Sequence, residues 1–329
     1  MDINVGIVGY GNLGRGVERA IKQNPDMKLA AVFTRRNPDM VKIEDKRVKV
    51  FHLDKAKEFV EDIDVMILCG GSATDLPQQG PHFSRLFNTV DSFDTHAEIP
   101  GYFAAVNDSA TAGGKTAAIS IGWDPGLFSM SRMLFEAVLP RGQEYTFWGK
   151  GVSQGHSDAV RRIEGVQKAV QYTVPVEATL RKVRNGETPS LTTGEKHTRE
   201  CFVVPEEGAD KEKISHAIKS IPNYFAGYET SVTFITDEEF TKNHTHMPHG
   251  GFVIRSGLTA EGYAVKKQIM EFSLKLESNP EFTAGVLTAY ARAVYRLNRE
   301  GQIGAKTVFD IPLAYLSIRT PEELRRKLL

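Results

Sequence analysis

Ile3-Asn4-Val5-Gly6-Ile7-Val8-Gly9-Tyr10-Gly11-Asn12-Leu13-Gly14-Arg15-Gly16 is the stretch that decides the fold of the first half of the chain. An apolar run with β-strand character breaks into G-x-G-x-x-G and then continues with helical periodicity. In such units the first glycine permits a tight turn, the second lacks the Cβ that would block a pyrophosphate, and the third lets the helix pack on the strand. We therefore expect a dinucleotide at the helix N-terminus. The expected contacts are Gly9, Gly11, Asn12, Leu13 and Gly14. The alternative is a glycine-rich turn that binds no ligand.

The length and the charge of the chain limit the classes of protein to which it can belong. A chain of 329 residues favours two domains. Lys and Arg together number 41, as do Asp and Glu, so no basic field is present to attract nucleic acid or an anionic membrane. Cys69 and Cys201 predict reduced thiols in a cytoplasmic protein. No apolar run approaches about 18 residues, and the first strand starts too early for a signal peptide. We expect a small-molecule partner, no nucleic acid and no membrane.

The first part of the chain alternates strands with helices, which predicts an α/β fold with a Rossmann-type doubly wound parallel sheet. After the opening strand, apolar runs predict strands at 27–33, 48–51, 64–69, 88–92 and 116–121. A helix is expected over 127–138.

From about residue 144 the pattern changes, and it predicts a second, α+β domain with a mixed or antiparallel sheet. Strands are expected at 144–148, 169–182, 198–204, 229–235, 251–255 and 266–277. Helices are expected at 158–166, 210–219, 280–300 and from Pro321 onward. We place the dinucleotide-binding domain at 1–122 and the substrate-binding and dimerisation domain at 123–302, with 303–329 packing back on the first domain.

The residues after the second strand predict which dinucleotide is preferred. An NAD-specific site has an acid about 20 residues after the glycines. This chain has Thr34, Arg35 and Arg36 there, and a hydroxyl with two guanidiniums suits the 2′-phosphate of NADP. The alternative is that both arginines are ordinary solvated charges.

Further cofactor contacts are expected where later strands end, because the carboxyl edge of a doubly wound sheet faces the dinucleotide. Asp94 and Asp124 both fall at such strand ends, where together they outline a site for a cation. Each alone could be a helix or turn cap. The expected contacts are Cys69, Gly70, Gly71, Ser72, Ser92, Phe93, Asp94, Ile121, Gly122, Trp123, Asp124 and Pro125.

Two features of the second half suggest anion recognition. His244, His246 and His249 are closely spaced, but neither the spacing nor the neighbouring residues match a zinc site, so no metal is expected. Imidazoles that donate to a carboxylate, beside the permissive glycines 250 and 251, are the preferred interpretation. Arg199, in an otherwise apolar and hydroxylated strand, could clamp a carboxylate or could snorkel to the surface.

Several segments together resemble the meso-diaminopimelate dehydrogenase family over nearly the whole chain. These are GIVGYGNLGRGVE at the start, TRR, SFDTH at 92–96, IGWDPG at 121–126, FWGKGVSQGHSDAVRRI from 147 and HGGFVIRSG from 249. The resemblance implies an NADP-dependent homodimer that oxidatively deaminates the D-centre of meso-diaminopimelate to L-2-amino-6-oxopimelate, in lysine and peptidoglycan precursor synthesis. It places the substrate against Asp94, Asp124, Trp148, Gln154, Gly155, Thr173, Arg199, His249 and Asn279.

The charges of these residues agree with such a substrate, which has two ammoniums and two carboxylates. Asp94 and Asp124 would hold the reacting amino group, and either acid, or a water held by them, could accept its proton as the catalytic base. Arg199 and the residues near it would hold the remote L-amino acid end. Trp148 would wall the reacting centre, although a core aromatic is its alternative role. Another NADP-dependent two-domain reductase, or a non-catalytic NADP(H) sensor, are the alternative functions.

Overall fold

The computed structural model describes residues 2–260 and 265–329, which form two compact units. The first unit comprises Met1–Met130 and Pro280–Leu329, and the second comprises Ser131–Asn279. These limits differ from the expected ones at 122 and 302. Residues 280–302 belong to the first unit because the apolar face of their helix is buried in its core.

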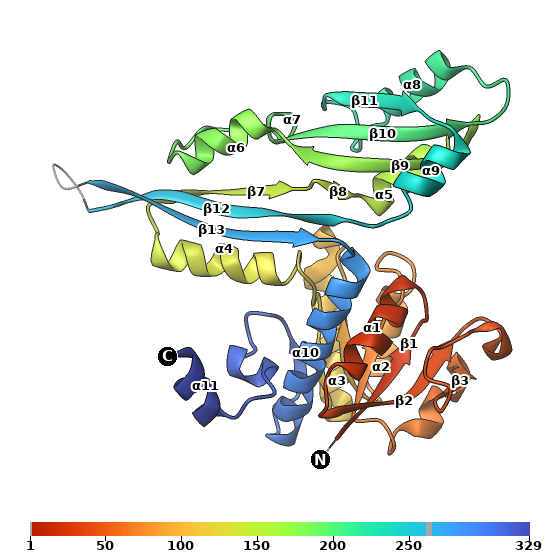
Figure 1. The fold of residues 1–329 in the computed structure, drawn as a ribbon. Coiled ribbons are helices and arrows are strands. Elements are labelled where there is room, and N and C mark those ends of the chain that lie inside the picture. The colour runs from red at the N-terminus through yellow and green to blue at the C-terminus, as the bar shows by residue number, and fades with distance from the viewer. Residues whose placement is uncertain (1, 261–264) are drawn as a thin grey trace. The chain divides into compact units, whose positions relative to one another are not determined.

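The first unit contains a seven-stranded sheet in the order β14-β6-β5-β4-β1-β2-β3. Strands β1, β2 and β3 of this sheet are labelled in Figure 1. Every pairing in it is parallel, which confirms the predicted Rossmann-type sheet. Its strands are β1 Ile3–Val8, β2 Met27–Thr34, β3 Lys49–His52, β4 Val65–Leu68, β5 Asn88–Asp91, β6 Thr116–Ala118 and β14 Gly304–Lys306. The central strands β4 and β5 are buried at every residue, as expected for strands covered on both faces.

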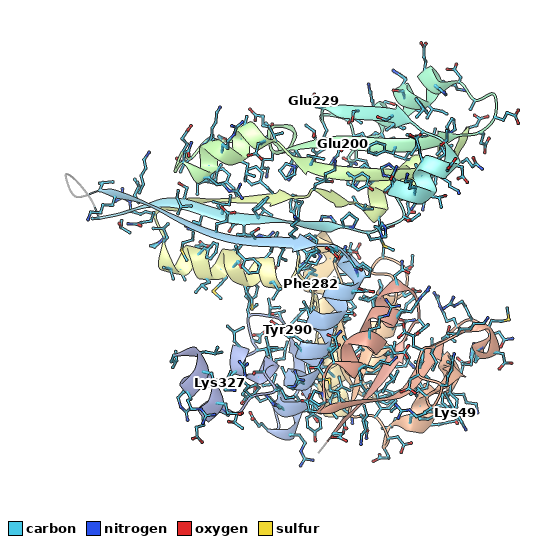
Figure 2. All side chains as sticks on the ribbon, in the orientation of Figure 1. Lys49, Glu200, Glu229, Phe282, Tyr290 and Lys327 are labelled. Carbon is cyan, nitrogen blue, oxygen red and sulfur yellow. The ribbon has the colours of Figure 1, made fainter. Side chains whose placement is uncertain are left out.

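Helices cover both faces of this sheet. One apolar cluster joins α1 and α10 to β1, and Tyr290 of α10, marked in Figure 2, is 1% exposed within it. A second cluster joins α2 and α3 to the opposite face. The helices of the unit are α1 Asn12–Lys22, α2 Leu76–Ser84, α3 Ile99–Gly113, α10 Asn279–Arg299 and α11 Pro321–Leu328, with short 3-10 helices at Pro38–Met40, Leu53–Phe59, His96–Glu98 and Leu313–Leu316. Helix α4, Leu127–Val138, crosses the limit between the units.

The strand order reverses at β1, which places a ligand crevice at its carboxyl end. From β1 the chain proceeds outward through β2 and β3, then returns to β4 on the other side of β1. At such a reversal the connections leave in opposite directions, and the space between them is where α/β sheets bind dinucleotides.

The second unit contains two sheets, one mixed and one antiparallel, as predicted. A four-stranded sheet has the order β11-β10-β9-β8, and a three-stranded sheet has the order β13-β12-β7. The strands are β7 Gly142–Trp148, β8 Gly151–Val152, β9 Val166–Pro175, β10 His197–Pro205, β11 Thr230–Phe234, β12 His249–Thr259 and β13 Lys266–Leu276. The helices are α5 Gln154–Arg161, α6 Glu177–Arg184, α7 Thr193–Lys196, α8 Lys211–Ser220 and α9 Asp237–Asn243.

Two expected elements of this unit are placed differently. The strand predicted over 169–182 ends at Pro175, and α6 follows it. An acid in the first turn of α6, basic residues in its last turn, and buried Leu180 and Val183 three positions apart stabilise a helix there. The helix expected at 158–166 begins at Gln154 instead. No helix in the described parts of the chain is long and apolar enough to cross a membrane.

Candidate functional site

The glycine fingerprint forms the predicted strand–turn–helix. Gly9 has φ of +89°, a conformation that a side chain would strain, and Gly11 precedes α1. A Cβ on Gly14 would lie 2.2 Å from the carbonyl oxygen of Gly9, so α1 packs against the turn only because Gly14 has none. A Cβ on Gly11, in contrast, would meet no atom within 4 Å. The backbone of Gly11 therefore faces open space, as close approach of a pyrophosphate requires.

The two arginines after β2 are held in different ways. Arg36 donates from Nη2 to the carbonyl oxygen of Tyr10 at 2.6 Å, and its backbone N–H donates to Thr34 Oγ1 at 3.1 Å. Arg35 has a 67% exposed side chain, and its guanidinium lies 2.7 Å from Asp75. Arg36 is thus attached to the fingerprint turn, and Arg35 is paired. Arg36 is therefore not an unattached surface charge, whereas Arg35 is largely exposed, and its contact with a 2′-phosphate stays a prediction.

The loops after β4 and β5 are joined by hydrogen bonds. Ser72 Oγ accepts from the backbone N–H of Asp94 at 2.8 Å, and it lies 3.1 Å from Thr95 Oγ1. Asp75 Oδ2 accepts from the N–H of Gly71 at 2.8 Å. Cys69, at the end of β4, is a free thiol whose pKa is raised by burial, so it stays neutral. The Gly70–Ser72 loop therefore contacts Asp94 directly and contacts Arg35 through Asp75.

The turn after β6 carries Asp124. Trp123 is 8% exposed and packs edge-on against Phe128, with 5.2 Å between ring centroids. The backbone N–H of Leu127 donates to the carbonyl oxygen of Gly122 at 3.1 Å, which closes the turn around Asp124 and Pro125. Asp94 is exposed and Asp124 is half-buried, so both carboxylates occur where a cation could reach them.

In the second unit, Arg199 and Thr173 form a buried pair. They lie opposite each other on the antiparallel strands β10 and β9, and Arg199 Nη1 donates to the Thr173 hydroxyl. Arg199 is 7% exposed, and its guanidinium carbon is 4.1 Å from the centroid of the Tyr228 ring. Burial lowers the pKa of Arg199. The snorkelling alternative is therefore wrong, because the guanidinium is held inside the unit rather than in water.

Trp148 and His249 are positioned by contacts within this unit. The backbone N–H of Trp148 donates to His197 Nε2 at 2.8 Å, and the two rings stack 5.3 Å apart. His249, the first residue of β12, packs on Gly151, where an added Cβ would lie 2.5 Å from the imidazole Cγ. Gly151 pairs in turn with Thr173 across β8 and β9. The structure thus connects His249, Thr173 and Arg199 through direct contacts or strand pairing, and it connects Trp148 to His197 on the same strand as Arg199.

Gln154 and Gly155 occupy the first turn of α5 and are exposed. The backbone N–H of Asn279 donates to the carbonyl oxygen of Met247 at 2.9 Å, which attaches it to the loop before His249. The three histidines do not gather: His244 stacks on Phe202 with 4.2 Å between centroids, and His246 is exposed. Within residues 2–260 and 265–329, no three His, Cys, Asp or Glu side chains are grouped to hold a metal.

Two positions of this arrangement were not predicted from the sequence. His197 supports Trp148, and burial together with the charge of Arg199 lowers its pKa to about 3, so it is a neutral acceptor. A single histidine in a strand gives no sequence signal for such a role. Asp75 immediately precedes α2, and its contact with Arg35 depends on tertiary structure.

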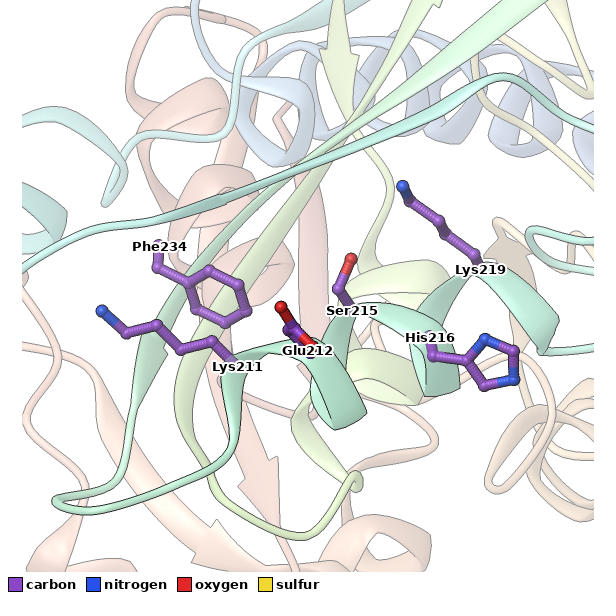
Figure 3. A pocket seen from close by; sticks show the side chains of 6 residues that line it. All are labelled: Lys211, Glu212, Ser215, His216, Lys219 and Phe234. Atoms are coloured by element: carbon purple, nitrogen blue, oxygen red, sulfur yellow. The ribbon is translucent and has the colours of Figure 1, made fainter.

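A surface hollow elsewhere contains none of the predicted residues. It measures about 420 Å³ and lies on α8 and β11 (Figure 3). Its walls are Lys211, Glu212, Ser215, His216, Lys219 and Phe234. These are ordinary surface residues of a short helix and an edge strand, so the hollow is no part of the candidate site.

A parallel sheet with the glycine fingerprint at its reversal point is the organisation of a dinucleotide-binding domain, so the chain falls in the class of dinucleotide-dependent proteins. A model of the diaminopimelic acid dehydrogenase C-terminal domain matches residues 122–278. Meso-diaminopimelate D-dehydrogenase of Ureibacillus thermosphaericus is 64% identical over 99% of this chain and 99% of its own. The chain therefore belongs to the meso-diaminopimelate D-dehydrogenase family and is an oxidoreductase of that type.

Several solved structures are similar over the full length, including the following two. A multiply substituted meso-diaminopimelate dehydrogenase of Clostridium tetani, crystallised with diaminopimelate, has a TM-score of 0.94 at 55% identity, with 100% of both chains covered. An engineered D-amino acid dehydrogenase bound to NADP+ has a TM-score of 0.86 at 44% identity, also with 100% of both chains covered.

The fingerprint glycines allow stability and cofactor binding to be separated. We expect Gly14→Ala to lower the free energy of unfolding by about 1–3 kcal/mol, because the methyl overlaps the Gly9 carbonyl. Gly11→Ala should keep wild-type stability, because its methyl meets nothing in the protein, yet weaken NADP+ binding by roughly tenfold or more. Thermal unfolding and NADP+ titration check both. Wild-type NADP+ affinity in Gly11→Ala would contradict the placement of the pyrophosphate.

Proposed function

We propose that this protein oxidises the D-centre of meso-diaminopimelate with NADP+, and that water then releases ammonia and leaves L-2-amino-6-oxopimelate. NADPH and a proton are formed as well. The two electrons removed from the D-centre and its amino group therefore pass to the cofactor. The observation that carries this proposal is the distribution of charge. Two carboxylates lie in the loops that follow β5 and β6 of the dinucleotide-binding unit, and a buried guanidinium lies in the other unit.

The fingerprint turn would hold the NADP pyrophosphate, and Arg35 and Arg36 would bind its 2′-phosphate. The open space at Gly11 and the attachment of Arg36 to the turn support this placement. NADP+ supplies the acceptor for the hydride that leaves the D-centre. The chain's own contribution is to bind, orient and deprotonate the substrate.

Asp94 and Asp124 would bind the reacting amino group. An ammonium cannot release a hydride from its carbon until it is neutral, so one acid, or a water it holds, accepts the proton. The Ser72 hydroxyl and the closed 122–127 turn fix the backbones that carry the two carboxylates. A fixed pair of acids both attracts the cation and aligns its carbon for transfer.

Arg199, Thr173, His249 and Asn279 would bind the remote L-amino acid end, with Trp148 walling the reacting centre. Arg199 Nε has no hydrogen-bond partner in the described part of the chain, so a donor is available for a ligand carboxylate. Five positions substituted in the C. tetani variant have the same number and residue type here. They are Gln154, Thr173, Arg199, Pro248 and His249. This agreement supports the placement of the substrate.

The assembly and location follow the same family. We place the reaction in lysine and peptidoglycan precursor synthesis in the cytoplasm, where both cysteines stay as free thiols.

A homodimer is supported by apolar side chains exposed on the second unit: Met133 at 48%, Leu134 at 52%, Val138 at 62% and Ile269 at 42%. Sedimentation at equilibrium should give twice the chain mass, and a monomer mass would oppose it. The balanced net charge gives no attraction for nucleic acid.

The proposed proton acceptor is tested at Asp124. We expect Asp124→Asn to lower kcat by about 10²–10⁴-fold, the usual contribution of a positioned base. Asp108→Asn, an exposed acid on α3 of the same unit, should leave kcat unchanged. Initial rates of NADPH formation measure both. Equal kcat for Asp124→Asn and the wild type would show that this carboxylate is not needed.

The remote clamp is tested at Arg199. Arg199→Met should lower kcat/KM for meso-diaminopimelate by about 10²-fold, because a bidentate charged contact is lost, and should affect D-alanine far less. Arg184→Met is the matched control, since Arg184 belongs to the same unit but pairs with Glu271 at its surface. Equal losses on both substrates would contradict the clamp.

A further inference from the structure

Asp91 is a buried carboxylate at the ligand end of the parallel sheet, and it has no place in the reaction described above. It is the last residue of β5 and is 1% exposed. Three groups donate to it: the Tyr102 hydroxyl at 2.7 Å, the backbone N–H of Phe93 at 3.0 Å and the backbone N–H of Ser120 at 3.2 Å. Burial raises the pKa of Asp91 to about 6, although these donors oppose the rise.

A single oxygen of this carboxylate connects two strand ends. Oδ1 accepts from Phe93, which immediately precedes Asp94, and from Ser120, which begins the segment leading to Asp124. The main-chain carbonyl of Asp91 also accepts from the N–H of Ile121 at 2.8 Å. The backbones that carry the two proposed substrate-binding acids are therefore fixed to one residue.

The segment after β6 needs such support because of its conformation. Ser120 has φ of +57°, in the left-handed region that residues other than glycine rarely adopt. Its N–H is turned toward Asp91 Oδ1 in that conformation. Without the acceptor, the buried N–H of Ser120 would be unsatisfied and the left-handed turn would lose this hydrogen bond.

The second oxygen of Asp91 is held by Tyr102 of α3. The Tyr102 ring also stacks on Phe93, with 4.0 Å between centroids and 15° between planes. Gly80 of α2 makes room for this phenol, since a Cβ there would lie 2.0 Å from the Tyr102 hydroxyl oxygen. Helices α2 and α3 thus hold the carboxylate at one orientation.

We propose that Asp91 is a positioning residue that aligns Asp94 and Asp124 through the backbones of Phe93 and Ser120. The inference rests on the proposed function, because it assigns Asp91 to the placement of the acids that function uses. Asp91 itself touches neither substrate nor cofactor in this account.

Asn88 provides a matched control at the opposite end of the same strand. Its amide also connects neighbouring strands, donating to the carbonyl oxygen of Asp64 at 2.9 Å and accepting from the N–H of Thr116 at 3.0 Å. Asn88 is 7% exposed. Its loss should destabilise the sheet in a similar way without moving the residues at the ligand end.

The experiment compares Asp91→Leu, Asp91→Asn and Asn88→Leu in the full-length enzyme. We expect Asp91→Leu to lower kcat by about 10²-fold with a smaller change in KM, since misplacement of about 1 Å can cost that much. The primary deuterium isotope effect with substrate deuterated at the D-centre should rise, because hydride transfer becomes limiting. Asp91→Asn keeps an oxygen for both N–H groups and should stay within about threefold of wild-type kcat. Asn88→Leu should lower Tm but not kcat.

If Asp91→Leu does not fold, Tyr102→Phe replaces it, and we expect about a three- to tenfold lower kcat from the loss of one donor. The positioning role would be overturned if kcat of Asp91→Leu were no lower than kcat of Asn88→Leu. The same criterion applies to Tyr102→Phe where it replaces Asp91→Leu. Asp94→Asn and Asp124→Asn variants, measured in parallel, distinguish a failure of the proposed function from a failure of the inference about Asp91. If neither slows turnover, the proposed function of the acids fails. If they slow it and Asp91→Leu does not, only the inference about Asp91 fails.

Discussion

The burial of the Arg199 guanidinium is the constraint to which the second unit is adapted. Removing a charge from water costs several kcal/mol unless a counter-charge or hydrogen bonds compensate for it. In the described part of the chain, the Thr173 hydroxyl and the face of Tyr228 contact this guanidinium, and no carboxylate forms an ion pair with it. In the proposed site, a substrate carboxylate would supply the missing counter-charge and would offset part of this cost.

Burial and, after it, the same charge keep two nearby histidines neutral. The pKa values of His156 and His197 are lowered to about 4 and about 3, first by burial and then by repulsion from Arg199. A neutral His197 can accept the N–H of Trp148, which a protonated ring could not do. The proposed clamp and the aromatic wall are therefore linked, because the charge of Arg199 adds to burial in keeping His197, the residue that supports the wall, neutral. In the other unit the charges have the opposite sign, at the ends of β5 and β6.

The sequence predicts the first unit well and the second less completely. The parallel sheet follows from continuous apolar strands and from glycines whose roles are local, such as Gly14 against Gly9. The limits of the units could not be predicted in this way, because an amphipathic pattern over 280–300 shows that a helix buries one face but not which core receives it. The end of β9 at Pro175 was missed since the segment after it also contains apolar residues at spacings compatible with a strand.

The site shows the same division between local and tertiary signals. The sequence leaves Arg199 as a clamp or a snorkelling surface residue; its 7% exposure excludes the surface role, and the carboxylate clamp stays a prediction. The spacing in the sequence groups His244 with His246 and His249. In the structure, His244 instead packs with Tyr172 and Phe202. Asp91 gave no signal, because an acid at a strand end is ordinary and its three donors come from β5, β6 and α3.

In the proposed site, groups of opposite charge recognise the two halves of one substrate. Comparing the stereoisomers of diaminopimelate as substrates is the sharpest test of this recognition. The measurement is the rate of NADPH formation from NADP+ with meso-, LL- and DD-diaminopimelate and with D-alanine. The account predicts that the meso isomer has the highest kcat/KM, that DD-diaminopimelate and D-alanine are much poorer because they lack the L-amino acid end, and that the LL isomer is not oxidised. Equal kcat/KM for meso-diaminopimelate and D-alanine, or no NADPH from any of them, would contradict it.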